Sequence, residues 1–592
     1  MKSISTIGIL LVFTAFFACK SSNQNKSDKL NVILILADDQ GYGDIGFNGN
    51  PYLQTPTLDS LSNVSYRFDN FYVSPVCAPT RASLLTGKYH YRTGTYWVSN
   101  GKENMNPAEY TLAELFRDNG YATGIFGKWH NGAHYPFHPN QQGFQKFVGF
   151  CMGHWNNYFN TTLEENGEPV LAEGYITDYL TKRAIQFIDE NKSHPFFCYI
   201  PYNTPHSPFQ VPDKYFDKYK QMGLDDKAAC VYGMCENIDD NVKKVLDEID
   251  QLGLKEKTIV LYLSDNGPVP GRYNANLRGT KGHIHEGGVK VPSMMYVPKS
   301  LMNGFQKQGH IQQIAAHIDI MPTLIDLLQL KVDSVPDFDG LSLVKVMEGL
   351  SDSLVNNRIF YSKAPQQFPE YMGGAVRTGN YRMVYRENDT MLFDLSTDPY
   401  EQYNLKNELP QLTDSLLNNY LHWIKKTMDK MPSFTAIPIG VPEQTNITMP
   451  AHEAKITGNV HFKEGHGWAN DWVLGFQNSL DSIYWETTVE NGTKYRLIMD
   501  YVASEKLLGK SVIISTESNS LNKIIDKVSD GVYVPSPDRF PRKEIGERRW
   551  GHLELGEFYM QHSDRYVSLK LNTTEINDLE FKALRLIKAD EN

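Results

Sequence analysis

The sequence predicts a doubly wound α/β fold, in which helices cover both faces of a largely parallel sheet. The first observation is a set of short runs rich in β-branched, leucine and aromatic residues, the pattern of strands buried on both faces, at 30–37, 121–127, 195–200 and 258–263. The second is a set of helical patterns that alternate with them, at 111–119, 177–191 and 232–252. The third is that each of the four strands runs directly into a polar cluster.

These polar clusters predict a single site. Asp38-Asp39 follows the first strand, Lys128 and His130 follow the second, His206 the third, and Asp265-Asn266 the fourth. In parallel sheets ligands bind beyond the carboxyl ends of the strands, so the four clusters are expected to meet there. Any one alone has an ordinary interpretation as a turn, a cap, a surface cation or a buried histidine. Four in one register indicate a functional site.

Beyond the α/β region (30–350) the pattern changes to short strands. A small antiparallel subdomain is predicted over 351–430. Its strands are expected at 358–362, 374–378, 381–385 and 390–394, and a helix is expected over 409–428. A proline-containing stretch, 431–450, is interpreted as a linker. Strands at 484–489, 494–502, 510–516 and 566–570 predict a β-sandwich accessory module over 451–592. Its tryptophans, Trp468, Trp472, Trp485 and Trp550, are either core residues or sugar-stacking platforms.

The N-terminus has the pattern of an export signal. An apolar run over 7–17, too short to span a bilayer, ends at Cys19, and a polar tether follows at 20–29. Residues 1–19 resemble a bacterial lipoprotein signal, although Phe16 stands where leucine is usual. We therefore expect a periplasmic protein or a cell-surface lipoprotein, with no membrane contact beyond a lipid anchor. Cys230 and Cys235 are expected either to pair or to remain free.

The charge balance restricts the partners. The formal net charge of −11 argues against nucleic-acid binding, which needs a basic surface. A local anion site remains compatible with it, and the segment 77–81 predicts one. Pro79 and Gly87 frame a helix with Cys77 at its N-terminus, where free N–H groups favour an anion, and Arg81 lies one turn further on. Lys281, in a glycine-rich basic loop over 277–292, is expected to supply another cation.

The oxygen donors Asp38, Asp39, Asp265 and Asn266 are the ligand types of a hard cation such as Ca²⁺ or, less favourably, Mg²⁺. A catalytic Zn²⁺ site usually uses His or Cys instead. The chain resembles type I sulfatases over roughly residues 30–430. The resemblance rests on six segments that occur in this order: ADDQGYGD, CAPTR, GKWH, PHSP, SDNG and RGTKGHIHEGG. The resemblance implies an alkaline-phosphatase-like fold and oxidation of Cys77 to formylglycine by a separate maturation enzyme. It also implies that Cys77 completes the metal shell.

The resemblance also implies a mechanism for sulfate ester hydrolysis. The cation, Arg81, Lys128 and Lys281 would neutralise the sulfate oxygens. One hydroxyl of the hydrated formylglycine would attack sulfur, and His206, with Lys281, would protonate the leaving sugar oxygen. His130 would then deprotonate the second hydroxyl, which expels sulfate. The expected substrate is a sulfated carbohydrate, either algal (ulvan, carrageenan, fucoidan) or animal, with pocket walls near His134, His138, His154 and Trp155.

Two other functions fit parts of the pattern. A phosphomonoester or phosphonate hydrolase would share the fold and the anion chemistry, but the CAPTR segment and the lack of a multi-histidine set argue against it. A surface glycan-binding lipoprotein on an inactive scaffold would need only the accessory module. The complete set of polar residues argues against that alternative.

Overall fold

The computed structural model describes residues 29–301, 309–332, 337–366, 372–572 and 578–589. The expected signal segment, 1–19, and all of the tether except Lys29 lie outside these residues. Within them, no helix combines the length and the apolar character needed to cross a bilayer. The described cysteines, Cys77, Cys151, Cys198, Cys230 and Cys235, are all buried free thiols, so Cys230 and Cys235 do not pair.

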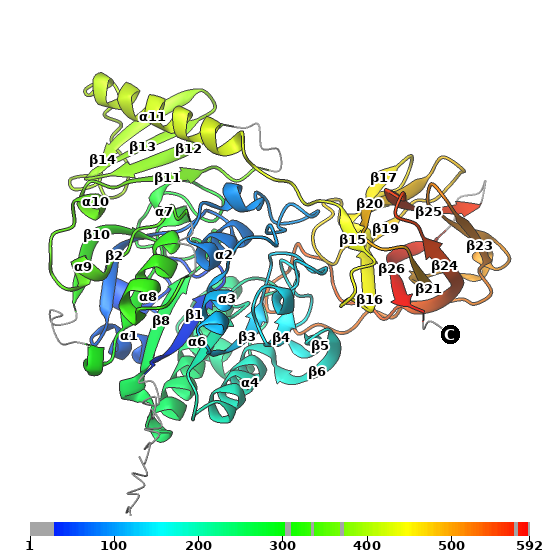
Figure 1. Ribbon diagram of the computed structural model, residues 1–592, viewed down its shortest axis with the longest axis horizontal. Coiled ribbons are helices and arrows are strands. Elements are labelled where there is room, and N and C mark those ends of the chain that lie inside the picture. The colour runs from blue at the N-terminus through cyan, green and yellow to red at the C-terminus, as the bar shows by residue number, and fades with distance from the viewer. Residues whose placement is uncertain (1–28, 302–308, 333–336, 367–371, 573–577, 590–592) are drawn as a thin grey trace, which may run out of the picture.

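A ten-stranded sheet forms the centre of the catalytic part, with the order β10-β2-β9-β8-β1-β7-β3-β4-β5-β6 (Figure 1). Its strands are β1 (Asn31–Ala37), β2 (Tyr66–Tyr72), β3 (Ala122–Lys128), β4 (Lys146–Phe150), β5 (Phe159–Glu165), β6 (Glu168–Tyr175), β7 (Phe196–Pro201), β8 (Thr258–Ser264), β9 (Ser293–Tyr296) and β10 (His310–Ala316). The four strands expected from the sequence, β1, β3, β7 and β8, are neighbours and run parallel. The predicted doubly wound fold is therefore confirmed.

Helices cover both faces of this sheet. They are α1 (Pro56–Ser62), α2 (Cys77–Thr86), α3 (Leu112–Asp118), α4 (Ile176–Glu190), α5 (Asp213–Gln221), α6 (Asp226–Gln251), α7 (Glu286–Val289), α8 (Ile320–Leu328), α9 (Val344–Met347) and α10 (Ser353–Asn356). Alternate residues of β1 enter different cores, because successive side chains of a strand point to opposite faces. Leu34 packs with residues of α2, α3 and α8, whereas Ile35 packs with residues of α1, α4 and α6. α6 begins earlier than the sequence pattern predicted.

A four-stranded antiparallel sheet follows, as predicted. It contains β11 (Ile359–Lys363), β12 (Gly374–Thr378), β13 (Tyr381–Arg386) and β14 (Asp389–Asp394), and α11 (Pro410–Met428) packs on it. In Figure 1 this subdomain lies at the top of the catalytic part.

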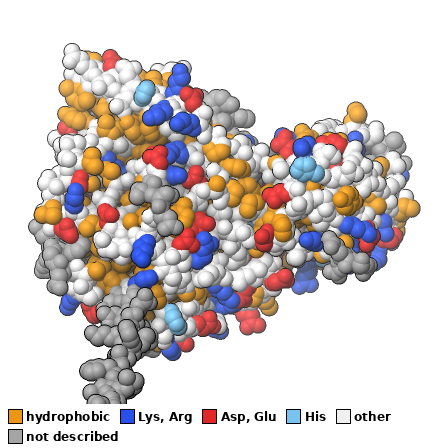
Figure 2. Space-filling model, in the orientation of Figure 1, with side chains coloured by type: hydrophobic (Ala, Val, Ile, Leu, Met, Phe, Trp, Pro, Cys, Tyr) orange, Lys and Arg blue, Asp and Glu red, His pale blue; other side chains and the backbone are white. Residues whose placement is uncertain are grey.

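Two six-stranded sheets form the C-terminal module around one apolar core. One sheet contains β15 (Ile437–Ile439), β17 (Lys455–Thr457), β20 (Ser482–Val489), β22 (Ser511–Ser515), β23 (Ser520–Ile524) and β25 (Tyr566–Asn572). The other contains β16 (Asn446–Pro450), β18 (His461–Phe462), β19 (Val473–Leu474), β21 (Thr493–Val502), β24 (Gly551–Met560) and β26 (Glu580–Lys588). The module is a separate lobe of the molecule, and acidic and basic side chains are interspersed over the face of both parts in view (Figure 2).

The interval expected to be a linker, 431–450, differs from the expectation. It contributes β15 and β16 to the two sheets of the module. Among the described residues, β15 pairs with β20 alone and β16 pairs with β26 alone, so both are edge strands. Pro438 and Pro450 are accommodated there because an edge strand can lack one backbone donor. The prolines that suggested a linker therefore mark the edges of the sandwich.

Candidate active site

Cys77 is the first residue of α2, and it lies in a pocket of about 260 Å³. The helix places Pro79 in its first turn and ends at Gly87, which adopts a left-handed conformation with φ of 68°. Only 3% of the Cys77 surface is exposed, and burial raises the pKa of its thiol. The pocket is lined by Val76, Cys77, Trp97, Val98, Ser99, His130, Gly153, His154, His206, Lys281, Trp468, Ala469 and Glu544.

Four oxygen-bearing side chains gather next to Cys77, as the sequence predicted. β1 and β8 are parallel neighbours in which Ala37 lies opposite Ser264, so the residues after both strands emerge together. The Asp39 backbone N–H donates to Asp265 Oδ1 at 3.1 Å, and Asn266 Nδ2 donates to Asp39 Oδ1 at 2.8 Å. All four, Asp38, Asp39, Asp265 and Asn266, are buried.

Arg81 and Lys128 bind these carboxylates through buried side chains. The Arg81 guanidinium donates to Asp265 Oδ2 from Nε at 3.2 Å and from its terminal nitrogen at 2.8 Å, and Lys128 Nζ lies 2.6 Å from Asp38 Oδ2. Both cations have fully buried side chains, and neither lines the pocket. They are positioned to fix the carboxylates beside Cys77.

Lys281 is the cation that faces the pocket. Its ammonium lies 2.7 Å from Asp39 Oδ1, and a fifth of its side chain remains exposed. Burial alone would lower the pKa of Lys281, but the Asp39 carboxylate outweighs it, so the pKa lies above its usual value. Lys281 is therefore a fixed positive charge beside Cys77.

The acidic cluster has the properties of a metal site. Ligand atoms of Asp38, Cys77 and Asp265 all lie within 4.8 Å of one another. Asp38 Oδ1 and Asn266 Oδ1 are buried and hydrogen-bond to no residue that the structure describes. Burial and the neighbouring Asp38 raise the pKa of Asp265 to about 7. Buried oxygens without a hydrogen-bond donor are costly, and Asp38 Oδ1 and Asn266 Oδ1 lie among further carboxylate oxygens, so these residues fit a bound hard metal ion.

His130 lines the pocket as an imidazole whose Nδ1 carries no hydrogen. Its Nε2 is 2.9 Å from the Val98 carbonyl oxygen, which can only accept, so Nε2 carries the hydrogen and Nδ1 keeps its lone pair. Nδ1 is buried and bonds to none of the described residues. Burial and the Lys128 ammonium hold the pKa of His130 well below its usual value. The imidazole is therefore neutral.

Two further histidines line the pocket. His206 Nε2 lies 3.8 Å from Asp39 Oδ2, and its Nδ1 lies 2.7 Å from the Ser207 carbonyl oxygen. The ring of His154 is parallel to that of His206, with centroids 6.3 Å apart. Burial and His206 hold the pKa of His154 well below its usual value. Of the residues expected near pocket walls, His154 lines this pocket, whereas His134, His138 and Trp155 line a separate groove.

The remaining pocket walls come from segments that the sequence pattern did not predict to lie near Cys77. Trp97 comes from a loop after α2, and Trp468 and Glu544 come from the C-terminal module. Of the four tryptophans that are either core residues or sugar platforms by sequence, Trp468 is 38% exposed, whereas Trp472 and Trp485 are each only 1% exposed and belong to the module's interior. Nothing in the spacing of these residues indicated that the module would reach Cys77.

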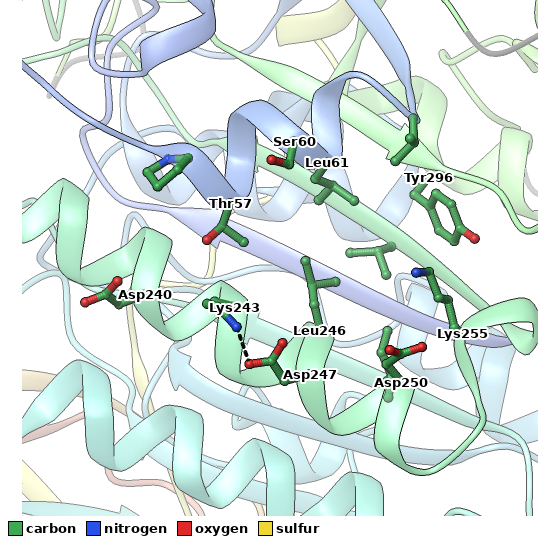
Figure 3. A pocket seen from close by; sticks show the side chains of 14 residues that line it. Thr57, Ser60, Leu61, Asp240, Lys243, Leu246, Asp247, Asp250, Lys255 and Tyr296 are labelled. Atoms are coloured by element: carbon green, nitrogen blue, oxygen red, sulfur yellow. Dashed lines mark hydrogen bonds and ion pairs between the residues drawn. The ribbon is translucent and has the colours of Figure 1, made fainter.

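A larger hollow of about 500 Å³ lies between α1 and α6, away from this chemistry (Figure 3). Leu61 and Leu246 line it, and Lys243 and Asp247 pair with each other at its edge. It contains none of the predicted site residues, so its size alone does not make it the active site.

With this geometry in place, comparison with known proteins identifies the family. The sulfatase family model matches residues 30–330, the part that holds the sheet and every predicted site residue. The chain belongs to the sulfatase family. A second model, the C-terminal part of N-sulphoglucosamine sulphohydrolase, matches residues 280–426. The protein is thus an arylsulfatase-like type I sulfatase and a sulfuric ester hydrolase.

Relatives of this sulfatase include human arylsulfatase A, which is 28% identical over 484 residues covering 71% of this chain and 92% of that protein. Mouse N-acetylgalactosamine-6-sulfatase is 30% identical over 367 residues, covering 56% of this chain and 68% of that protein. Among solved structures, Ps i-CgsB in complex with k-i-k-neocarrahexaose matches with a TM-score of 0.63 and 27% identity, covering 69% of this chain and 95% of that one. Members of the family typically use a formylglycine residue and a metal ion.

Proposed function

We propose that this sulfatase hydrolyses sulfate monoesters on carbohydrates. The observation that carries the proposal is the placement of Cys77 at a helix N-terminus, in a pocket with Lys281 and beside a buried cluster of carboxylates. N–H groups of a helix N-terminus and a fixed ammonium attract an anion such as a sulfate ester. Two similar proteins support a carbohydrate substrate, one by its name, N-acetylgalactosamine-6-sulfatase, and one by its bound neocarrahexaose.

The proposed cofactors are formylglycine at position 77 and Ca²⁺ held by Asp38, Asp39, Asp265, Asn266 and residue 77. When both are present, they supply a nucleophilic oxygen and a Lewis acid that neutralises sulfate charge. The all-oxygen side-chain set favours Ca²⁺ over Zn²⁺. Modification by a maturation enzyme is part of the proposal, because a buried thiol with a raised pKa is a poor nucleophile.

The chain's own residues then have separate roles. Arg81 and Lys128 fix the orientation of Asp265 and Asp38. Lys281 binds a sulfate oxygen, since it is the ammonium that lines the pocket. His206 donates a proton to the leaving sugar oxygen, and His130 removes a proton from residue 77 through its free Nδ1.

Two measurements test the function. Intact-mass analysis of active enzyme should show formylglycine in place of the Cys77 thiol, and the enzyme should release sulfate from 4-nitrophenyl sulfate. Cys77→Ala should abolish turnover and keep the melting temperature within about 2 °C of the wild type. Activity that survives this substitution would refute the mechanism.

The phosphomonoester or phosphonate hydrolase alternative is tested with 4-nitrophenyl phosphate on the same calcium-loaded enzyme. A phosphonate monoester hydrolase matches with a TM-score of 0.52 at 18% identity, which is a likeness of fold alone. We expect turnover of the sulfate to exceed that of the phosphate. The reverse order would favour this alternative.

Export is proposed from the sequence of residues 1–29. Lipidation at Cys19 would place the enzyme at a membrane surface, facing extracytoplasmic polysaccharide. Labelling with radioactive palmitate should mark the wild type and not Cys19→Ala. If neither the wild type nor Cys19→Ala is labelled, the proposed lipid anchor is wrong.

A further inference from the structure

The C-terminal module is firmly joined to the catalytic part next to the pocket. Asn470 Nδ2 donates to the carbonyl oxygen of His154, which itself lines the pocket, at 3.1 Å. Gln210 Nε2 of the catalytic part donates to Asp538 Oδ1 at 2.8 Å, and the Arg539 backbone N–H donates to the Phe209 carbonyl at 2.8 Å. These bonds anchor two segments of the module, 466–471 and 536–545. In Figure 1 the second is part of the orange connection that reaches from the module toward the catalytic part.

Each anchored segment places one side chain in the pocket of Cys77. The first carries Trp468, and the second carries Glu544. Trp468 is 38% exposed, whereas tryptophan is highly buried on average, and His466 stacks on it at a centroid distance of 4.5 Å. Glu544 accepts a hydrogen bond from Ser207, and it forms no ion pair with any residue in the described ranges. An aromatic surface and a carboxylate that has no ion-pair partner among the described residues therefore line the pocket of Cys77.

We propose that the C-terminal module builds the sugar-binding wall of the active site. Trp468 stacks on the ring of the sugar that carries the sulfate, and Glu544 accepts hydrogen bonds from its free hydroxyl groups. The inference rests on the proposed carbohydrate sulfatase function and specifies its substrate class. The substrate is a sugar residue with one sulfate and neutral neighbouring groups.

The division of charge in the pocket supports this class. Lys281 and the helix N-terminus attract the sulfate at the Cys77 side, whereas Glu544 presents negative charge on the module side. A second sulfate or a carboxylate on the same sugar would face Glu544 and be repelled. A sugar hydroxyl, by contrast, donates to a carboxylate in a strong charge-assisted bond. The pocket volume of about 260 Å³ is at the small end for ligand sites, which suits one sugar residue.

The test compares variants on sulfated sugars and on a small aryl ester. The probes are 4-nitrophenyl sulfate and a panel of galactose and N-acetylgalactosamine monosulfates, together with the matching disulfates. Trp468→Ala should lower kcat/KM for the best monosulfated sugar about 10- to 30-fold, mainly through KM, and by much more than it lowers kcat/KM for the aryl ester. Trp468→Phe should recover most of the loss. Tyr566→Ala is the matched control, because Tyr566 is an equally exposed aromatic residue of the same module that does not line the pocket.

Glu544→Gln tests the charge argument. It should raise the ratio of disulfated to monosulfated turnover at least fivefold, whereas the exposed control Glu554→Gln should leave that ratio unchanged. If the wild type releases sulfate from sugars but Trp468→Ala and Glu544→Gln match their controls, the inference is wrong and the proposed function stands. If the wild type releases sulfate from none of the probes, the proposed function itself fails. Unequal losses on sugar and aryl ester, reversed by Trp468→Phe, would support the inference.

Discussion

The role of Arg81 gives the sharpest prediction about the site. Arg81 has no exposed surface, and its guanidinium makes two bonds to Asp265 Oδ2 and one of 2.7 Å to the Lys128 carbonyl. In Arg81→Lys a single ammonium cannot reproduce this fork, so about two of the three bonds are lost. At about 1.5–3 kcal/mol for each, the expected cost in unfolding free energy is about 3–6 kcal/mol. With an unfolding entropy of about 2.1 cal/mol/K per residue over roughly 400 residues, the melting temperature should fall by about 4–7 °C.

Scanning calorimetry and steady-state kinetics together test this role. Arg382→Lys is the control, because Arg382 is equally buried and bonds to Glu286 Oε1 at 3.0 Å outside the pocket. Both variants should lose comparable stability. Only Arg81→Lys should lose kcat on 4-nitrophenyl sulfate, by about 100-fold, with little change in KM because Arg81 does not touch the pocket. Full kcat in Arg81→Lys, or an equal loss of kcat in Arg382→Lys, would refute the reasoning.

Three further predictions concern the metal, a buried acid and the module. Dialysis against EDTA should abolish turnover and lower the melting temperature, and Ca²⁺ at about 100 times its Kd should restore about 2.7 kcal/mol of stability in the wild type but not in Asp265→Asn. Burial and the neighbouring Glu453 raise the pKa of Glu103 to about 8. The folded state therefore binds an extra proton between about pH 4.5 and 8 and loses stability as pH rises, so Glu103→Gln should gain stability over the wild type in thermal melts at pH 8 and show no gain at pH 4. Trp485, which is 1% exposed and donates to the Pro450 carbonyl at 2.8 Å, should cost about 3–5 kcal/mol when changed to Ala, measured on the calorimetric transition of the module.

The carboxylate cluster could be predicted from the sequence because its position depends only on where two parallel strands end. Buried runs end at Ala37 and Ser264, and parallel strands bring their carboxyl ends to one edge. Helix α2 was predicted for a similarly local reason, since Pro79 and Gly87 mark its two ends. What lies within a few residues of a strand end or a helix cap could therefore be placed without the structure.

The burial of individual side chains and the contacts between distant segments could not be predicted in this way. The side chains of Arg81 and Lys128 are fully buried against the carboxylates, whereas Lys281 lines the pocket. This difference depends on how the side chains pack in the folded protein. Trp468 and Glu544 are separated from Cys77 by several hundred residues and by an independently formed sandwich. The hydrophobic pattern of a segment predicts its own secondary structure, but it does not predict which distant part of the chain the segment will contact.

The anchored segments 466–471 and 536–545 belong to a unit whose hydrophobic core is its own. The reacting groups and the contacts that select a sugar are thus carried by different folding units of one polypeptide. Replacement of these two loops, with the sandwich beneath them left intact, offers a way to retarget the enzyme to another polysaccharide. The nucleophile and its surrounding charges would stay untouched by such an exchange.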